Sequence, residues 1–413
     1  MSFQDEAGLG GFSRSRLERV TRSLEGYLER EEILGAVTRV FRHGVLAHQV
    51  TLGWQDRENL VPMQPDSIFR IMSMTKPVIA AAALTLVEEG TLRLDDPVDP
   101  WLPELADRQI LLDPDGPLDG EVYPSLTPIT LRDILTNRLG IGFHLGRVPY
   151  CAMTLDYNPG PLSYAQRNQG HPRKTLDLPP DEWMAEIGKL PWRYSPGEYW
   201  LYNTASDILG VLLARATGMD LAKFLQQRLF EPLGMRDTGF VVPAEKLDRF
   251  TVGYALDSTG QKIIAIDHPA NSFYARPPIF PSGAAGLVST ADDYLKFGRM
   301  LLGKGKVDNT RILSRKAVEL MTTDQLNSEQ RAAAIGGPGF GSNQGYGFGV
   351  ATINEQTQLG PGAGAYTWGG AYGTHWVADP GEDLVIVLLY QMMSGPQHIS
   401  EDFNTLVYQA IDD

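Results

Sequence analysis

The feature that most constrains the fold of this chain is that segments with strand-forming character lie near both of its ends. Near the N-terminus, the turn Arg42-His43-Gly44 separates two apolar stretches and predicts a hairpin formed by Ala36 to Phe41 and Val45 to Leu52. The last quarter carries four further candidates: Tyr346 to Ile353, Tyr366 to Trp368, Thr374 to Val377 and Leu384 to Gln391. We therefore predict an α+β fold in which one antiparallel sheet is built from both chain termini and flanked by helices, with a mostly helical insertion between them.

The predicted helices show apolar residues at helical spacing or a recognisable start signal. From Ser13 onward, an apolar stripe with charged residues on its other face predicts an amphipathic helix through Leu17, Val20, Leu24 and Leu28. Thr290 followed by Asp293 is typical of a capped N-terminus, and we expect this helix to run to about Leu302. Further helices are predicted at 130–135, at 202–229 and from about 400.

The order of these segments predicts two domains, with the functional site expected between them. The sheet domain comprises residues 1–81, 198–237 and 290–413, and the helical or irregular domain comprises 82–197 and 238–289. Within the second domain, the stretch 143–190 is rich in aromatic residues and long for a loop. The aromatic side chains of this stretch either line an apolar pocket or pack beneath a surface loop, and both interpretations fit the sequence.

The composition excludes several classes of partner. A formal net charge of -14 over 413 residues disfavours nucleic acid and anionic membranes. Cys151 is the only cysteine, so no intramolecular disulfide forms, and we interpret it as a structural or incidental thiol. The N-terminus has no signal-peptide pattern, and the longest apolar run, Val78 to Val87, is too short to span a bilayer. We expect a cytoplasmic protein, and a homo-oligomer is compatible with the sequence.

A serine and a lysine three residues apart stand at the start of an apolar segment. With Pro77 in the first turn, the helix is expected to begin close to Ser73. Residues three apart share one helix face, so the Lys76 amine can reach the Ser73 hydroxyl. The positive end of the helix would then face that oxygen as it becomes an alkoxide. The pattern favours an activated nucleophile, although a Ser-x-x-Lys spacing alone is not specific.

Other common catalytic signatures are absent from the sequence. There is no Gly-x-Ser-x-Gly elbow, no His-Glu-x-x-His, no paired-cysteine metal spacing and no Walker phosphate loop, so we expect no metal and no cofactor. Two patterns agree instead with Ser73 and Lys76: Trp200-Leu201-Tyr202-Asn203-Thr204 and Trp368-Gly369-Gly370-Ala371-Tyr372-Gly373. With the segments 129–137, 230–238 and 282–290, the chain resembles the serine β-lactamase and penicillin-binding-protein-like superfamily. It is most similar to the family VIII carboxylesterases, which are related to class C β-lactamases.

The resemblance implies an acyl-enzyme mechanism and a set of roles. Ser73 would be the nucleophile, and Lys76 would either lower the proton affinity of the Ser73 and Tyr202 oxygens or act as the base itself. Tyr202 would move the proton to the leaving group, as a phenolate or through its hydrogen bond. The backbone N–H groups of Ser73 and Ala371 would form the oxyanion hole. Trp368, Gly369 and Gly370 would contact the substrate.

Two departures from the β-lactamase pattern matter. The second motif has Thr204 where β-lactamases have Asn after Tyr-x, and a shift by one residue would align Asn203 and replace the tyrosine by Leu201. We prefer Tyr202, because the sequence then continues into Asp207-Ile208-Leu209-Gly210 without a gap. At the third motif, Trp368-Gly369-Gly370 replaces Lys-Thr-Gly, whose lysine holds a substrate carboxylate. A tryptophan offers an apolar wall instead, which favours neutral esters.

The sequence therefore predicts a serine hydrolase that cleaves small carboxylic esters, with acyl transfer or weak β-lactam hydrolysis as side activities. One alternative is an amide hydrolase of the same superfamily, such as a β-lactamase, a D-peptidase or a linear-amide hydrolase. A second alternative is a binding protein that kept the fold without catalysis, which the intact Ser73, Lys76 and Tyr202 disfavour.

Overall fold

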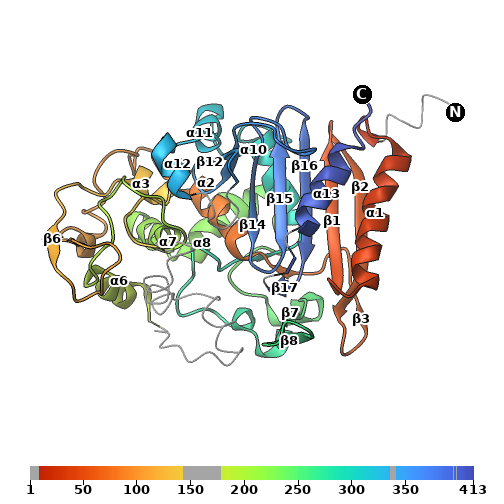
Figure 1. The fold of residues 1–413 in the computed structure, drawn as a ribbon, viewed down its shortest axis with the longest axis horizontal. Helices are drawn as coiled ribbons and strands as arrows, with labels where there is room; N and C mark the ends of the chain where they lie inside the picture. Colours follow the sequence, from red (N-terminus) through yellow and green to blue (C-terminus); the bar gives the residue numbers. More distant parts are fainter. Residues whose placement is uncertain (1–8, 143–177, 335–340, 394, 397) are drawn as a thin grey trace.

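The computed structural model describes residues 9–142, 178–334, 341–393, 395–396 and 398–413 (Figure 1). Its helices are α1 Arg14–Glu29, α2 Thr75–Glu88, α3 Leu131–Leu135, α6 Pro180–Gly188, α7 Thr204–Thr217, α8 Leu221–Leu225, α9 Glu231–Leu233, α10 Ala291–Leu302, α11 Arg315–Met321, α12 Ser328–Ala334 and α13 His398–Tyr408. The strands of the main sheet are β1 Gly35–Arg42, β2 Val45–Asp56, β3 Val61–Pro62, β12 Gln344–Tyr346, β13 Ala351–Ile353, β14 Tyr366–Gly370, β15 Thr374–Asp379 and β16 Leu384–Tyr390. The remaining strands are β4 Phe69–Arg70, β5 Gln109–Leu111, β6 Val122–Pro124, β7 Gly253–Leu256, β8 Ile263–Asp267, β9 Val288–Ser289, β10 Lys306–Val307, β11 Thr310–Arg311 and β17 Met392–Met393.

The main sheet joins both ends of the chain, as predicted. Its strand order is β12-β13-β14-β15-β16-β1-β2-β3, and each neighbouring pair is antiparallel. The central pairing is β1 with β16, which sets Val37 opposite Leu389. The N-terminal hairpin is also confirmed: His43 and Gly44 both have positive φ, the conformation of a tight turn that follows the twist of the strands.

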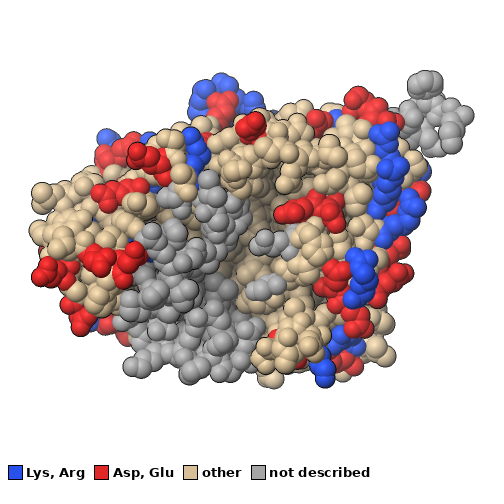
Figure 2. All heavy atoms as spheres, in the orientation of Figure 1, with Lys and Arg blue, Asp and Glu red and all other residues tan. Residues whose placement is uncertain are grey.

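Helices cover both faces of this sheet (Figure 1). Alternate residues of β16 point to opposite faces: Leu384, Ile386 and Leu388 pack in the cluster that includes residues of α1 and α13. Val385, Val387 and Leu389 pack in the cluster that includes α2, α7 and α10. This alternation follows from the pleat of a strand, and a strand buried on both faces reads as a continuous apolar run. The charged face of α1 points outward, where Lys and Arg form a column along one edge of the molecule (Figure 2).

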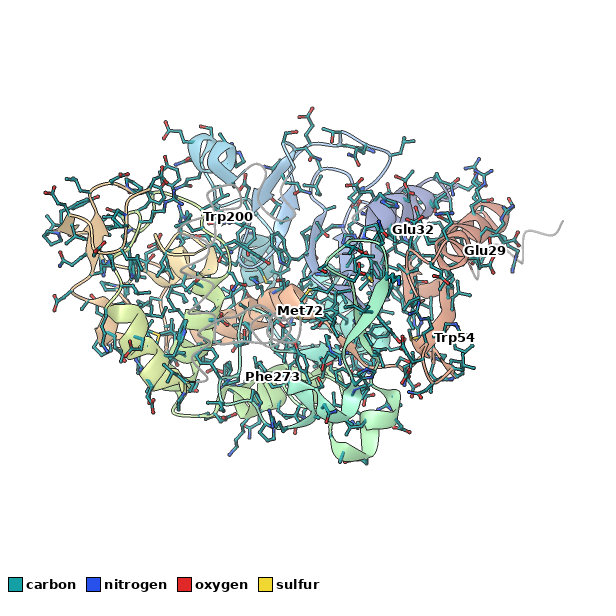
Figure 3. All side chains as sticks on the ribbon, turned by 60° about the horizontal axis from the view of Figure 1, so that its bottom comes forward. Glu29, Glu32, Trp54, Met72, Trp200 and Phe273 are labelled. Atoms are coloured by element: carbon teal, nitrogen blue, oxygen red, sulfur yellow. The ribbon has the colours of Figure 1, made fainter. Side chains whose placement is uncertain are left out.

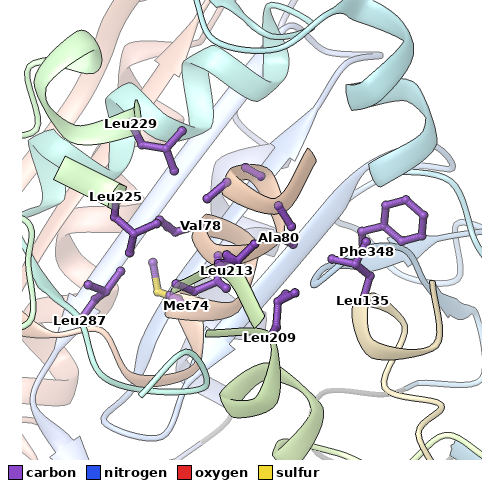
Figure 4. Close-up of a cluster of buried hydrophobic side chains, with 14 of the residues drawn as sticks. Met74, Val78, Ala80, Leu135, Leu209, Leu213, Leu225, Leu229, Leu287 and Phe348 are labelled. Carbon is purple, nitrogen blue, oxygen red and sulfur yellow. The ribbon is translucent and has the colours of Figure 1, made fainter. Parts of the chain in front are cut away.

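The helix that follows Ser73 lies in the middle of the core. Every residue of α2 from Thr75 to Leu86 is buried, because the helix is apolar on all sides and therefore needs neighbours all round. Figure 4 shows side chains from other elements around it: Leu209 and Leu213 of α7, Leu225 of α8, and Leu229, Leu287 and Phe348 from further segments. This packing fixes the position and rotation of α2, and with it the residues at its N-terminal end.

Two predicted elements are wrong in extent. The helix expected at 202–229 stops at Thr217, since Gly218 takes the left-handed conformation that ends helices, and Asp220 caps the separate helix α8. The strand expected at 346–353 is two strands, β12 and β13, because the chain reverses at Gly347 to Val350. The predicted helices at 130–135, 290–302 and the C-terminus are present, as α3, α10 and α13.

Between α2 and the second half of the sheet, the chain forms helices and small sheets. The fold class predicted from the sequence is therefore confirmed, with an antiparallel sheet from both chain ends and a largely helical middle. A small sheet of β17, β7 and β8 lies beside the main one. The domain boundaries given above stay a prediction.

Candidate active site

Ser73 lies in a sharp turn at the entrance to α2. Residues Met72–Met74 form a single 3-10 turn between β4 and α2, and Met72 has a φ of 48°, an uncommon value for a residue with a side chain. Met72 itself lies near the middle of the molecule (Figure 3). Ser73 is 8% exposed, and Pro77 falls in the first turn of α2, as expected. The serine therefore precedes the helix by two residues and is held at its N-terminal end.

The Lys76 amine touches three oxygen atoms. Its Nζ lies 3.0 Å from Ser73 Oγ, 3.0 Å from Asn203 Oδ1 and 2.8 Å from the carbonyl oxygen of Ala284. The side chain is 1% exposed. Burial disfavours the ammonium form and lowers the pKa of Lys76 to about 7, and the negative charge of Asp207 works against this shift. The shift favours the neutral amine, which is the form that can accept a proton.

Tyr202 provides a second oxygen at the same place. Its hydroxyl accepts a hydrogen bond of 3.2 Å from Trp368 Nε1, and the Lys76 Nζ lies 4.3 Å from the centroid of its ring. Burial raises the pKa of Tyr202 to about 12, and hydrogen bonds with Ser73 and Trp368 work against the shift. Leu201, the residue that the shifted alignment would put in its place, is fully buried and has no polar group in its side chain. The structure thus brings Ser73, Lys76 and Tyr202 together.

Asn203 takes part in this arrangement in a way that the sequence did not indicate. It stands at the N-cap of α7 with a φ of 82°, yet its side chain makes no capping bond. Its Oδ1 accepts from Lys76 instead. Asn tolerates a positive φ better than most residues, which is consistent with this position. In the sequence, Asn203 entered only as the residue of the rejected alignment.

Trp368 does not present the open apolar wall that the sequence suggested. It is 4% exposed and packs within a group of aromatic rings. Ring centroids lie 5.7 Å apart between Trp368 and Tyr202, 5.3 Å between Trp368 and Tyr346, and 5.6 Å between Trp200 and Tyr202. With its indole nitrogen on the Tyr202 hydroxyl, Trp368 orients that phenol rather than offering its face to a ligand.

The glycines after Trp368 bring the sheet close to the nucleophile. A Cβ at Gly370 would overlap the carbonyl oxygen of Ile71, and Thr374 Oγ1 donates to that same oxygen at 3.1 Å. Gly369 is exposed, and Gly370 and Ala371 are partly exposed. Within the described ranges, the backbone N–H groups of Ser73 and Ala371 donate to no protein acceptor. The role of these two N–H groups as an oxyanion hole stays a prediction.

The expectations for the 143–190 stretch fall mostly outside the described residues, as does Cys151. Of its aromatic residues, Trp183 lies on α6, where it is buried against Phe280 with ring centroids 4.9 Å apart. This residue packs in the main hydrophobic core. Across the described residues, no group of three or more His, Cys, Asp or Glu side chains is arranged to hold a metal ion. None of the helices in these ranges combines the length and apolar character needed to cross a membrane.

Comparison with known proteins identifies the family. Residues 20–409 match the model of the Beta-lactamase family. An uncharacterized protein of Mycobacterium tuberculosis is 39% identical over 364 residues, covering 86% of this chain and 85% of that one. The esterase EstB of Burkholderia gladioli is 32% identical over 393 residues, covering 90% of this chain and 91% of that one. The solved structure of EstCE1, described as a hydrolase with promiscuous acyltransferase activity, has the same fold, with a TM-score of 0.73, 24% identity and coverage of 97% and 99%. The chain therefore belongs to the Beta-lactamase family and is a serine β-lactamase-like hydrolase with esterase relatives.

Proposed function

We propose that this protein is a carboxylesterase that cleaves small neutral esters through an acyl-enzyme formed on Ser73. The observation that carries the proposal is the contact of 3.0 Å between the buried Lys76 amine and Ser73 Oγ, with the Tyr202 hydroxyl beside them. A buried amine with a lowered pKa next to a hydroxyl is the arrangement that makes serine a nucleophile near neutral pH.

Each step then has a group to perform it. Ser73 Oγ attacks the ester carbonyl carbon while its proton passes to the neutral Lys76 amine. The negative charge that develops on the carbonyl oxygen is stabilised by the N–H groups of Ser73 and Ala371. Tyr202, which is protonated at neutral pH, gives its proton to the leaving alkoxide and recovers one from the Lys76 ammonium. Water or a second alcohol then attacks the acyl group, and its proton returns to Ser73.

The residues around this centre favour esters without a carboxylate. Trp368-Gly369-Gly370 carries no cation at the place where penicillin-binding relatives have Lys-Thr-Gly. EstB is an esterase, and EstCE1 is described as transferring acyl groups as well as hydrolysing, so acyl transfer to an alcohol is a reasonable side activity for this chain.

Amide hydrolysis is the competing proposal, and the match to the Beta-lactamase family is the observation that favours it. Turnover of a p-nitrophenyl acyl ester, of nitrocefin and of a D-Ala peptide by the same preparation separates the two. We expect the ester to be hydrolysed with a much higher kcat/KM than either amide. Strong amide turnover with negligible ester turnover would contradict the esterase proposal.

The nucleophile is tested with an alkyl fluorophosphonate, which reacts covalently with activated serines. We expect labelling and ester turnover in the wild type, and loss of both in Ser73→Ala. Ser15→Ala, which removes an exposed hydroxyl from α1, serves as the matched control and is expected to behave as the wild type. Equal ester hydrolysis by Ser73→Ala would disprove the assignment.

A further inference from the structure

Asp207 is a buried carboxylate that the proposed chemistry does not use. It lies one turn into α7 and is 1% exposed. Its Oδ1 accepts hydrogen bonds of 2.6 Å from Ser282 Oγ and 3.1 Å from the Ala284 N–H. In the part of the chain that the structure describes, it makes no hydrogen bond to Ser73, Lys76 or Tyr202. A carboxylate is costly to bury, so its two partners and its position call for an explanation.

The two groups that Asp207 binds belong to the segment that contacts Lys76. Ala284 donates its N–H to Asp207 and accepts the Lys76 amine on its carbonyl oxygen at 2.8 Å. Ser282 uses its Oγ twice, donating to Asp207 and accepting from the Ala285 N–H at 3.1 Å. Asp207 Oδ1 therefore holds Ala284 directly through its N–H and indirectly through Ser282, whose Oγ also binds the next residue, Ala285. Ala284 is the residue whose carbonyl oxygen contacts the Lys76 amine.

Close packing holds the same segment against α7. A Cβ at Gly283 would overlap the carbonyl oxygen of Ser206, and the Cα of Gly283 lies where a Cβ at Gly210 would be in contact. Gly283 therefore allows residues 282–284 to lie directly on the helix that carries Asp207. The contacts run without interruption from α7, through this segment, to the amine.

We infer that Asp207 is a positioning residue that holds the Ala284 carbonyl against Lys76 and so aims the amine at Ser73. The inference rests on the proposed function, in which the neutral amine takes the Ser73 proton. A neutral amine has two N–H groups and one lone pair. When Asn203 Oδ1 and the Ala284 oxygen accept the two N–H groups, the lone pair is left facing Ser73 Oγ.

The charge of Asp207 also acts on the amine. Burial, as the larger effect, raises the pKa of Asp207, while its hydrogen bonds with Ser282 and Ala284 and the nearby Lys76 lower it. In return, the Asp207 charge raises the pKa of Lys76 against the effect of burial. Among the described residues, Lys76 is the charged side chain that lowers the pKa of Asp207, and the other titratable group at the amine is the Tyr202 phenol. Removing the charge without removing the acceptor should therefore make Lys76 more acidic.

Two substitutions at Asp207 separate position from charge. In Asp207→Asn, the amide oxygen still accepts from Ser282 and Ala284, so we expect kcat/KM above pH 8 to stay within about threefold of the wild type. The acid limb of the kcat/KM profile of Asp207→Asn should shift to lower pH by about half a unit or more. In Asp207→Ala, both bonds are lost, and we expect kcat to fall about tenfold or more with KM nearly unchanged, because misplacement of a catalytic group slows the chemical step. Asp293→Asn, a buried carboxylate on α10 away from the amine, is the matched control with an unshifted profile.

The same variants are followed by the rate of fluorophosphonate labelling and by crystallography. If the wild type labels at Ser73 but does not hydrolyse esters, the proposed function fails and the labelling rate against pH still tests Asp207. If Asp207→Ala does not fold, the inference is tested by the other two variants. It is supported if the pH profile of Asp207→Asn shifts and if Ser282→Ala has a reduced kcat. A folded Asp207→Ala with wild-type kcat, or one whose Ala284 oxygen stays within hydrogen-bond distance of Lys76, would overturn the inference, as would an unshifted profile in Asp207→Asn.

Discussion

At the scale of single residues, burial shifts the pKa values of the two candidate proton carriers, Lys76 and Tyr202, in opposite directions. Burial disfavours the charged form of both, which lowers the pKa of Lys76 to about 7 and raises that of Tyr202 to about 12. The sequence left open whether the amine or a phenolate is the base. The buried pair favours the amine as the base and the phenol as the proton donor.

This division predicts the pH dependence of kcat/KM. Below its pKa, Lys76 is an ammonium and cannot accept the Ser73 proton, so we expect kcat/KM to fall as the pH drops through about 7 and to level off above it. The profile should be measured with a neutral ester from pH 5 to pH 10, a range in which the substrate does not titrate. A rate that keeps rising through pH 10, toward the pKa of Tyr202, would instead identify the phenolate as the base.

Removal of the Tyr202 hydroxyl should be costly. We expect Tyr202→Phe to lower kcat by at least about a hundredfold, the usual contribution of a positioned proton donor, while the ring contacts with Trp200 and Trp368 remain. Tyr199→Phe is the matched control, since Tyr199 is exposed three residues away and stacks on Tyr194. Near-normal turnover in Tyr202→Phe would contradict the role of its hydroxyl and favour the shifted alignment, in which Leu201 occupies the position of the tyrosine.

The sequence indicated the site only as far as local patterns reach. Ser73 and Lys76 are three residues apart and Tyr202 lies in a short motif, so all three could be predicted from the sequence. Asn203 and Ala284 contact the Lys76 amine although they lie 127 and 208 residues away in the sequence. Their contacts depend on how α2, α7 and the segment 282–284 pack together. Asp207 stood out only as part of a segment similar to the family pattern, because burial of a carboxylate leaves no local signature.

At the scale of elements, a buried ion pair ties the strand before Ser73 to the small sheet. Arg70 of β4 donates to Asp267 of β8 at 2.6 Å, to the Thr251 carbonyl at 2.6 Å and to Gln391 Oε1 at 3.1 Å. Arg70 also lies over the ring of Phe250, with its Cζ 3.9 Å from the centroid. Arg70 lies three residues before the nucleophile, and its side chain thus contacts three other segments of the chain, at 250–251, 267 and 391.

Breaking this pair should destabilise the fold. Arg70→Ala leaves the Asp267 carboxylate buried without its cation, and we expect the free energy of unfolding to fall by about 3–5 kcal/mol. Urea unfolding followed by tryptophan fluorescence measures the change. Arg228→Ala removes the exposed pair with Glu89 and is expected to cost less than about 1 kcal/mol. Equal effects of the two substitutions would show that the buried network adds nothing to stability.

The errors in predicted element lengths also have particular causes. The segment 346–353 has the composition of a strand, but the chain reverses between β12 and β13. In this turn Gly349 has a φ of 73° and lies so close to α2 that a Cβ would press on the carbonyl oxygen of Lys76. The helix expected to continue past Thr217 ends because Gly218 takes a φ of 63°. Both segments contain glycines, and these were the residues in the sequence that could have indicated a turn or a helix end. The Lys76 carbonyl that requires a glycine at position 349 lies more than 270 residues away and could not be predicted from the local pattern.

At the scale of the whole molecule, the two chain ends are joined to each other as well as to the sheet. The Ser13 N–H donates to the Ala410 carbonyl at 2.8 Å, and the Asp412 N–H donates to the Gly11 carbonyl at 2.9 Å. Arg42 of β1 donates to Asp413 and to the Gly10 carbonyl, each at 2.8 Å. In Figure 1 the C mark lies close to α1 and α13, on the side of the molecule where the described part of the chain begins. These bonds tie the segment before α1 and the segment after α13 to each other and to the end of β1.

This arrangement predicts that stability and activity can be separated. Phe403 of α13 is buried with Leu17, Val20 and Ile386 in a cluster on the face of the sheet away from α2. We expect Phe403→Ala to lower the free energy of unfolding by about 3–5 kcal/mol, since a large buried side chain leaves a cavity. The kcat/KM of the folded protein should stay unchanged, because this cluster contains none of the residues at Ser73. Urea unfolding and active-site titration with the fluorophosphonate measure the two quantities on one sample. Leu406→Ala, at a partly buried position of α13, should cost less, and a loss of kcat/KM per labelled site in Phe403→Ala would show that the sheet transmits the change to the nucleophile.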